Sequence, residues 1–239
     1  MASSTSSDLK LELITTGEKS GTWGTITNTN LQILEQAASG YISVDVASSD
    51  VALALSNHAG SNGKNLYFKF TGTLDANRTV TMPDSAERVF IVEDATTRST
   101  SNFTLTIKTV SGTGIALPVG SKCLVYSDGT NINLGIRQKG YYTPTTAYTA
   151  VDGDQLLIDT SGSGIGSAIT ITLPASPSVG SEVHFIDSGN NFASNNLTIA
   201  RNGSNILGAA SNLVVNTSAS AFTLVFVNAT RGWAYKTKI

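Results

Sequence analysis

The sequence predicts an all-β protein with one short helix, organised as an N-terminal segment and two related β domains. Composition supports this class, because only 13% of the 239 residues are charged, about half of the usual share. Serine, threonine, asparagine and glycine replace them, and these residues suit strand faces and turns better than helix surfaces. Apolar and polar residues also alternate along most of the chain after Gly40, as they do in half-buried strands.

The first residues are predicted to form such a strand. Leu9, Leu11 and Leu13 alternate with two charged residues over residues 9–15, which places the leucines on one face. No apolar run of signal-peptide length follows, so we expect the protein to be made in a cytoplasm without a signal peptide.

A loop and one short helix come next. Glycines bound a loop that presents Trp23, and a capping-box pattern then predicts a helix over about residues 29–39 that stops at Gly40. An isolated helix of this length is marginal in water, so it needs a partner for Leu31, Leu34 and Ala37, which it presents. That partner is either its own β domain or another protein.

The domain organisation follows from composition and pattern. Residues 1–40 form the N-terminal segment, and residues 41–139 and 140–239 form two small β-sandwich or barrel-like domains. The stretch at 140–145 interrupts the strand pattern and is predicted to be a linker.

The second domain repeats the first. Five segments match in order, with an offset that drifts from 91 (174 against 83) to 100 (226 against 126) as loop lengths change. The matched segments are 65–68 and 155–158, 79–83 and 170–174, 90–94 and 185–188, 105–107 and 197–199, and 124–126 and 224–226. This order predicts an internal duplication, in which Cys123 corresponds to Thr223.

Charge, hydropathy and cysteine content exclude several classes of partner. The net charge is −2 at pH 7 and the lysines and arginines are scattered singly, so no nucleic-acid partner is expected. No stretch of about 18 apolar residues occurs, so no membrane insertion is expected. A single cysteine, Cys123, rules out a disulfide within one chain.

No catalytic, cofactor or metal site is predicted, and the chain is not expected to be an enzyme. His58 and His184 are far apart in sequence and lack metal-ligand spacing. Glu93 and Asp94 are adjacent on a predicted strand, so they would point to opposite faces and could not flank one bond.

Two loops are candidate ligand sites. The Asp-Gly-Asp at 152–154 is typical of a turn, with a surface calcium site as the alternative. The glycine-rich segment 162–166 lacks the ending of a phosphate-binding loop and precedes a strand, so a turn is expected there as well.

Aromatic side chains offer one candidate binding feature. Tyr141, Tyr142 and Tyr148 cluster around the linker and are candidate contacts for a host surface polysaccharide, since aromatic rings can stack on sugars. Trp233 and Tyr235 share a strand face, which fits a core or a subunit interface better than an exposed sugar platform.

The N-terminal block is the most specific feature of the sequence. Its motifs are LKLEL at 9–13, GTWG at 21–24, NTNL at 28–31 and LEQA at 34–37, followed by Gly40. Over about residues 8–40 the chain resembles a leader at the start of many tailed-phage virion proteins, often tail fibres. The rest resembles, more loosely, the Ser/Thr/Asn-rich β modules that follow such leaders.

This resemblance implies a place in the virion, with residues 1–40 attached to other phage structural proteins. The residues expected to make this attachment are Leu9, Leu11, Leu13, Trp23, Leu31 and Leu34. Small β domains without a disulfide or metal expose strand edges and gain stability by assembly, so a homotrimer is expected.

The function expected is therefore structural, as a tail-associated appendage such as a short tail fibre or a fibre adaptor. One alternative is a capsid decoration or head-fibre protein, and another is a receptor- or glycan-binding module. A polysaccharide depolymerase is the weakest alternative, because the sequence shows no convergent set of acids or nucleophiles.

Overall fold

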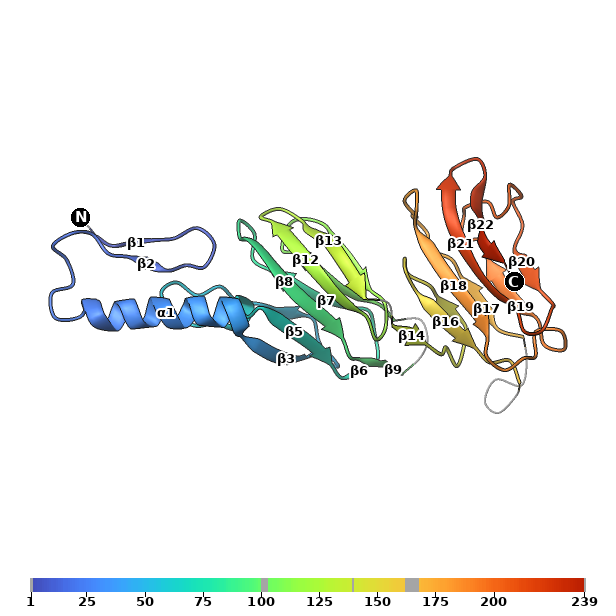
Figure 1. Cartoon of the computed structure of the whole chain (residues 1–239), viewed down its shortest axis with the longest axis horizontal. Coiled ribbons are helices and arrows are strands. Elements are labelled where there is room, and N and C mark those ends of the chain that lie inside the picture. Colours follow the sequence, from blue (N-terminus) through green and yellow to red (C-terminus); the bar gives the residue numbers. More distant parts are fainter. Residues whose placement is uncertain (1, 100–102, 139, 162–167, 239) are drawn as a thin grey trace. The chain divides into compact units, whose positions relative to one another are not determined.

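The computed structural model describes residues 2–99, 103–138, 140–161 and 168–238 (Figure 1). In this part the chain is mostly β with one α-helix, so the predicted all-β class is confirmed. The chain divides into two compact units. The first holds Met1–Thr97, Leu105–Leu117 and Lys122–Gln138, and the second holds Arg98–Thr104, Pro118–Ser121 and Lys139–Ile239. The N-terminal segment thus belongs to the first unit, and the glycine-rich segment 162–166 lies outside the described residues.

The first unit contains two main sheets. Its five-stranded sheet has the order β13-β12-β8-β5-β3, and its four-stranded sheet has the order β11-β10-β7-β4. The bounds are β3 Tyr41–Asp45, β4 Val51–Ala52, β5 Tyr67–Thr71, β7 Arg78–Met82, β8 Glu87–Asp94, β10 Leu105–Thr109, β11 Gly114–Leu117, β12 Lys122–Asp128 and β13 Ile132–Gln138. Two short strands, β6 (Thr73–Leu74) and β9 (Thr97–Arg98), pair with each other.

The chain passes back and forth between these sheets. The strands β3, β5 and β8 pair in parallel in one sheet, and β4, β7 and β10 pair in parallel in the other. A parallel pair needs a crossover, and here a strand of the opposite sheet lies in each crossover, which gives a solenoid-like stacking. The pairs β10–β11, β8–β12 and β12–β13 are antiparallel and complete the sheets.

Strand alternation explains the core of this unit. Phe68 and Phe70 of β5, Phe90 of β8, and Val80 and Met82 of β7 are all fully buried. Their neighbours in sequence point outward and are more exposed, which is the period-two pattern of a strand with one buried face.

The second unit has the same strand order. Its sheets are β22-β21-β18-β16-β14 and β20-β19-β17-β15. The bounds are β14 Tyr141–Tyr142, β15 Tyr148–Thr149, β16 Gln155–Ile158, β17 Thr170–Thr172, β18 Glu182–Asp187, β19 Leu197–Ala200, β20 Leu213–Val215, β21 Ala221–Asn228 and β22 Gly232–Lys238. One hydrophobic core joins both sheets and includes Trp233, while Tyr235 is partly buried against it.

The two units also agree in detail. Each has a register shift between the last two strands of its five-stranded sheet, at Leu124/Val125 and at Thr223/Leu224. Strand pairing therefore makes Leu124 equivalent to Thr223, and Cys123 equivalent to Phe222. The sequence match of Cys123 with Thr223 is therefore wrong by one position. The matches of 65–68 with 155–158 and of 90–94 with 185–188 are each wrong by two positions, because unequal loops shift the alignment between the strands.

Candidate interaction surfaces

The N-terminal segment forms a hairpin instead of the strand predicted over residues 9–15. Strands β1 (Ser4–Thr5) and β2 (Glu12–Leu13) pair antiparallel. The chain reverses between them, with Lys10 in the left-handed region at φ 57° and the Leu11 N–H donating to Ser6 Oγ at 2.8 Å. The three leucines therefore do not share one strand face: Leu9 and Leu11 are half-buried in the turn region, and Leu13 is 49% exposed.

The helix α1 spans Trp23–Ser39 and begins earlier than predicted. The expected cap, Thr29, lies inside the helix and donates its hydroxyl to the Thr25 carbonyl oxygen at 3.0 Å. The predicted end is confirmed, since α1 ends at Ser39 and Gly40 follows it. A Cβ at Gly40 would lie 2.3 Å from the Gln36 carbonyl oxygen, so this crowded position needs a glycine.

One face of α1 packs on its own unit. The Asn30 side chain forms two hydrogen bonds with the backbone of Glu12: its Oδ1 accepts the Glu12 N–H at 3.0 Å, and its Nδ2 donates to the Glu12 carbonyl oxygen at 2.8 Å. Ile33 is 1% exposed, and Gln36 Nε2 donates to the Ser61 carbonyl oxygen at 3.0 Å, beside the short 3-10 helix η1 (Asn62–Lys64). Docking of the helix on its own domain, one of the two alternatives, is therefore observed for this face.

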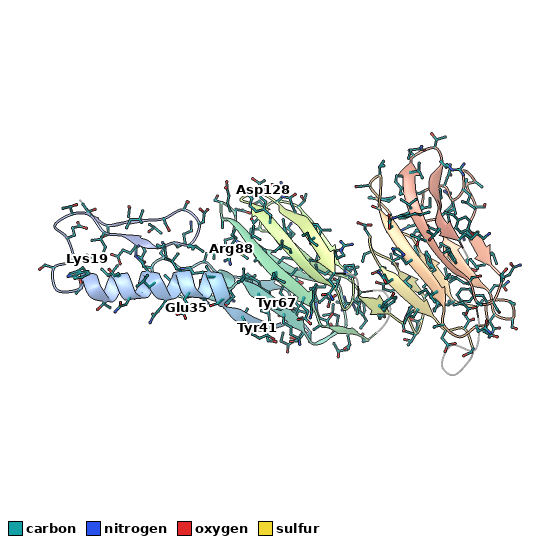
Figure 2. The ribbon with its side chains drawn as sticks, viewed as in Figure 1. Lys19, Glu35, Tyr41, Tyr67, Arg88 and Asp128 are labelled. Atoms are coloured by element: carbon teal, nitrogen blue, oxygen red, sulfur yellow. The ribbon has the colours of Figure 1, made fainter. Side chains whose placement is uncertain are left out.

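The loop between β2 and α1, together with Trp23 at the start of α1, carries an ion pair and an exposed tryptophan, and we call it the tip of the segment. Lys19 Nζ lies 2.9 Å from Glu12 Oε1, and its hydrogen bond lowers the pKa of the Glu12 carboxyl. The backbone N–H of Trp23 donates to the Lys19 carbonyl oxygen at 2.9 Å, which ties the start of α1 to this loop. Figure 2 shows Lys19 beside the start of the helix. The Trp23 side chain remains 63% exposed.

The opposite face of α1 has no covering within the described residues of the chain. Leu31 is 57% exposed and Leu34 is 42% exposed. Ala38 continues this line at helical spacing, and Tyr41 lies two residues beyond the end of α1, at the start of β3; both are exposed. We call these four residues, Leu31, Leu34, Ala38 and Tyr41, the helix stripe.

A second exposed line crosses the five-stranded sheet of the first unit. The strand registers align five outward-facing residues across all five strands, and we call them the sheet row: Tyr41, Tyr67, Ile91, Leu124 and Ile136. Ile136 is 70% exposed and Leu124 is 37% exposed. The rings of Tyr41 and Tyr67 lie 5.6 Å apart, so the stripe and the row meet at Tyr41 (Figure 2).

The linker tyrosines do not form one exposed cluster. Tyr141 is 62% exposed on the edge strand β14. Tyr142 is half-buried, with its ring 5.0 Å from that of Tyr148. Tyr148 is only 4% exposed and donates its hydroxyl to Asp154 Oδ2 at 2.9 Å, so it is a core residue with no surface for a glycan.

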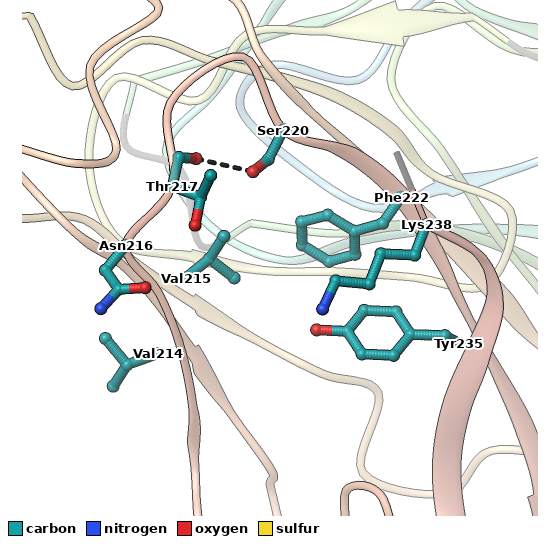
Figure 3. A pocket seen from close by; sticks show the side chains of 8 residues that line it. All are labelled: Val214, Val215, Asn216, Thr217, Ser220, Phe222, Tyr235 and Lys238. Atoms are coloured by element: carbon teal, nitrogen blue, oxygen red, sulfur yellow. Dashed lines mark hydrogen bonds between the residues drawn. The ribbon is translucent and has the colours of Figure 1, made fainter.

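Two small pockets lie in the second unit. One of about 190 Å³ is lined by residues that include Val215, Phe222, Tyr235 and Lys238, with Lys238 Nζ 4.9 Å from the Tyr235 ring centroid (Figure 3). The other, of about 160 Å³, has Tyr141 at its edge. Both are smaller than typical pockets for drug-sized ligands, which measure about 300–1,000 Å³.

The acidic loop at 152–154, the candidate calcium site, has its carboxylates hydrogen-bonded to the protein. Asp154 Oδ2 accepts the Val151 N–H at 2.8 Å as well as the Tyr148 hydroxyl, and Asp152 Oδ1 accepts the Glu182 N–H at 2.8 Å. In the described ranges, no group of three or more His, Cys, Asp or Glu side chains is placed to hold a metal ion. No helix in those ranges is long and apolar enough to cross a membrane.

No protein-family model matches the chain, and no curated protein matches it.

Proposed function

We propose that this chain is a structural protein of a bacteriophage particle, namely a tail-associated appendage such as a short tail fibre or a fibre adaptor. The observation that carries the proposal is the N-terminal segment, whose motifs resemble a virion leader and whose helix holds Trp23, Leu31 and Leu34 exposed. Exposed large apolar side chains in one region mark interaction sites on soluble proteins. Residues 1–40 would attach the protein to other phage structural proteins.

The anchoring contact is proposed to centre on the tip of this segment. Trp23 is the first residue of α1, and Leu13 and Ile14 lie at the end of β2, just before the loop that leads to it. The side chain of Trp23 is 63% exposed, that of Leu13 is 49% exposed and that of Ile14 is 36% exposed. A tryptophan that is free on the surface can fill a pocket of a partner, and such side chains dominate the energy of protein interfaces.

The β units are proposed to be two sandwich-like domains that arose by duplication and assemble as a homotrimer. The shared strand order and the equivalent register shifts favour duplication. Open edge strands at β13, β3, β22 and β14 favour assembly, because unpaired edges are a liability for a free monomer.

Complementation of a phage that lacks this protein tests the anchoring role. Trp23→Ala should lower the amount of the protein in purified particles, while Thr25→Ala, an exposed change on the same helix, should leave that amount unchanged. Equal incorporation of both variants would refute anchoring through Trp23. Immunogold labelling of particles then gives the location: label on the tail supports the appendage, label over the head supports a capsid decoration or head-fibre protein, and no label refutes a virion role.

Glycan binding is a second candidate function, favoured by one observation. Tyr141 is 62% exposed at the edge of a pocket whose other residues include Gln155 and His184, so an aromatic ring stands beside hydrogen-bonding groups. Binding of the whole chain to host surface polysaccharide should fall in Tyr141→Ala and remain in Val179→Ala, which changes a side chain of the second unit that is 76% exposed and does not line this pocket. Binding that is absent or equal in both variants would refute this role.

A further inference from the structure

We propose that the helix stripe and the sheet row form the interface between copies of this chain in a parallel homo-oligomer, the trimer of the proposed function. The inference rests on that trimer and deepens it by naming its surface. It also gives Leu31 and Leu34 a second copy of the chain as their partner, instead of another virion protein. Trp23 and the tip of the segment remain for the anchor.

The spacing of the helix stripe on α1 matches a seven-residue repeat. Alternating steps of three and four residues connect Gly24, Thr27, Leu31, Leu34 and Ala38. A line with this seven-residue repeat is the seam of a coiled coil, which packs best against a helix with the same repeat. A second copy supplies that helix by symmetry, at the same height when the copies run parallel.

The helix α1 carries almost no charge. Among the residues of α1 only Glu35 is charged, whereas a helix that faces water usually has charged and polar residues along its outer face. Copies of α1 can therefore approach each other with little electrostatic repulsion. The small residues Gly24 and Ala38 leave room for the larger side chains of a neighbouring helix at the same seam.

The row of the second unit that is equivalent to the sheet row is mostly polar. The strand registers there align Tyr141, Gln155, His184, Thr223 and Thr237. Apart from the tyrosine these residues are polar, and they bond to one another: Thr223 Oγ1 lies 2.8 Å from His184 Nδ1 and 3.1 Å from Thr237 Oγ1. The fold thus does not require an apolar row, and the apolar row of the first unit needs a partner to cover it.

The stripe and the row also form one continuous surface. Tyr41 starts β3 two residues after α1 ends, belongs to both lines, and lies against Tyr67. The surface continues to Val89 and Tyr126 in the next row, which are paired in register and are 50% and 40% exposed. A line of exposed apolar side chains that runs along a helix and across the five strands of a sheet marks an interaction surface.

Light scattering on the purified full chain tests the assembly. The wild-type chain should have three times the mass of the 24.9 kDa monomer at micromolar concentration. Leu31→Glu combined with Leu34→Glu should reduce the mass to that of the monomer. The matched control, Thr25→Glu combined with Gln32→Glu, places the same charges on exposed positions outside the stripe and should leave the trimer intact. Circular dichroism checks that each variant is folded.

Two further variants test geometry. Ala38→Cys should form disulfide-linked chain pairs under mild oxidation, because a seam residue meets its own copy in a parallel assembly, while Gln32→Cys should not; the native Cys123 is buried. Ile136→Lys should weaken the trimer, while Thr237→Lys, the equivalent change in the second unit, should not.

Each outcome decides the proposal. A wild-type monomer overturns it, and so does a trimer that survives the paired glutamates in the stripe. Equal cross-linking at positions 38 and 32 overturns the parallel seam. None of these results depends on particle labelling, so the surface can fail while the virion role stands, and the reverse.

Discussion

Arg88 is expected to hold the loop on which α1 docks. Its guanidinium is buried and donates to the carbonyl oxygens of Gly63, Lys64 and Asn65, and burial lowers the pKa of Arg88 to about 10. Its Cζ also lies 5.6 Å from the Phe90 ring centroid. The side chain therefore links β8 to the loop that contacts the helix.

Arg88→Met should keep most of the packing and remove these hydrogen bonds. A buried carbonyl left without a partner costs about 1–3 kcal/mol. Three such groups at the low end give a loss of about 3 kcal/mol, because the loop can take up some water and the cost of burying the guanidinium is removed. In a region that exchanges by local opening, this loss speeds amide exchange by about 100-fold.

Hydrogen exchange read by mass spectrometry measures this effect segment by segment. Residues 56–66 should exchange faster in Arg88→Met, and the second unit of the same sample should be unchanged. Arg231→Met changes an exposed arginine and should have little effect anywhere. The reasoning would be refuted by an unchanged loop, or by equal acceleration in both units.

Three more predictions concern single side chains. The Tyr67 hydroxyl donates to Glu93 at 2.6 Å. Burial, and to a smaller extent this hydrogen bond, raises the pKa of Tyr67 to about 12. The raised pKa stabilises the folded state fully below about pH 10, and this stabilisation is lost as the pH rises through about 12. Tyr67→Phe should remove a tyrosinate absorbance component near pH 12, and loss of one near pH 10 would contradict this. Ile33→Ala should cost about 2–4 kcal/mol and speed exchange in α1, and unchanged exchange there would mean that this face is not packed. Asp187→Ala removes a carboxylate that accepts three backbone N–H groups, so it should destabilise the second unit by about 2 kcal/mol, measured by urea unfolding and Trp233 fluorescence, with an unchanged midpoint as the contrary result.

The strand content could be predicted because strand alternation is a local signal. Residues such as Phe68 and Phe70 repeat every second position and are buried as that pattern requires. The helix end was also predictable, since Gly40 is a residue with no Cβ at a crowded site. Glu93 and Asp94 point to opposite faces for the same geometric reason, with Asp94 buried.

The N-terminal hairpin could not be predicted from its leucines. The chain reverses at residues that include a left-handed Lys10, and lysine carries no turn signal. The start of α1 was missed because its first turns are rich in threonine and asparagine, which have weak helix propensity. Those turns are helical in a tertiary context, in which Asn30 bonds to the backbone of Glu12.

The candidate site shows the same limit. Tyr148 looks like its neighbours in sequence, but the Asp154 carboxylate satisfies its hydroxyl inside the protein. Partners that lie six residues apart across a turn give no pattern that distinguishes a buried tyrosine from an exposed one. A buried tyrosine with a carboxylate partner has its pKa raised well above the ordinary value, so a titration would have identified it.

The proposed interface was hidden in the sequence for a related reason. In β12, Cys123 and Val125 face the core while Leu124 and Tyr126 face outward, so the strand looks like one continuous apolar run. Such a run normally indicates a strand buried on both faces. Here the register places the second apolar face on the outside, and the equivalent position in the second unit is Thr223. Two units with one backbone plan therefore differ in these outer rows: the row of the first unit is apolar, and that of the second is polar apart from Tyr141.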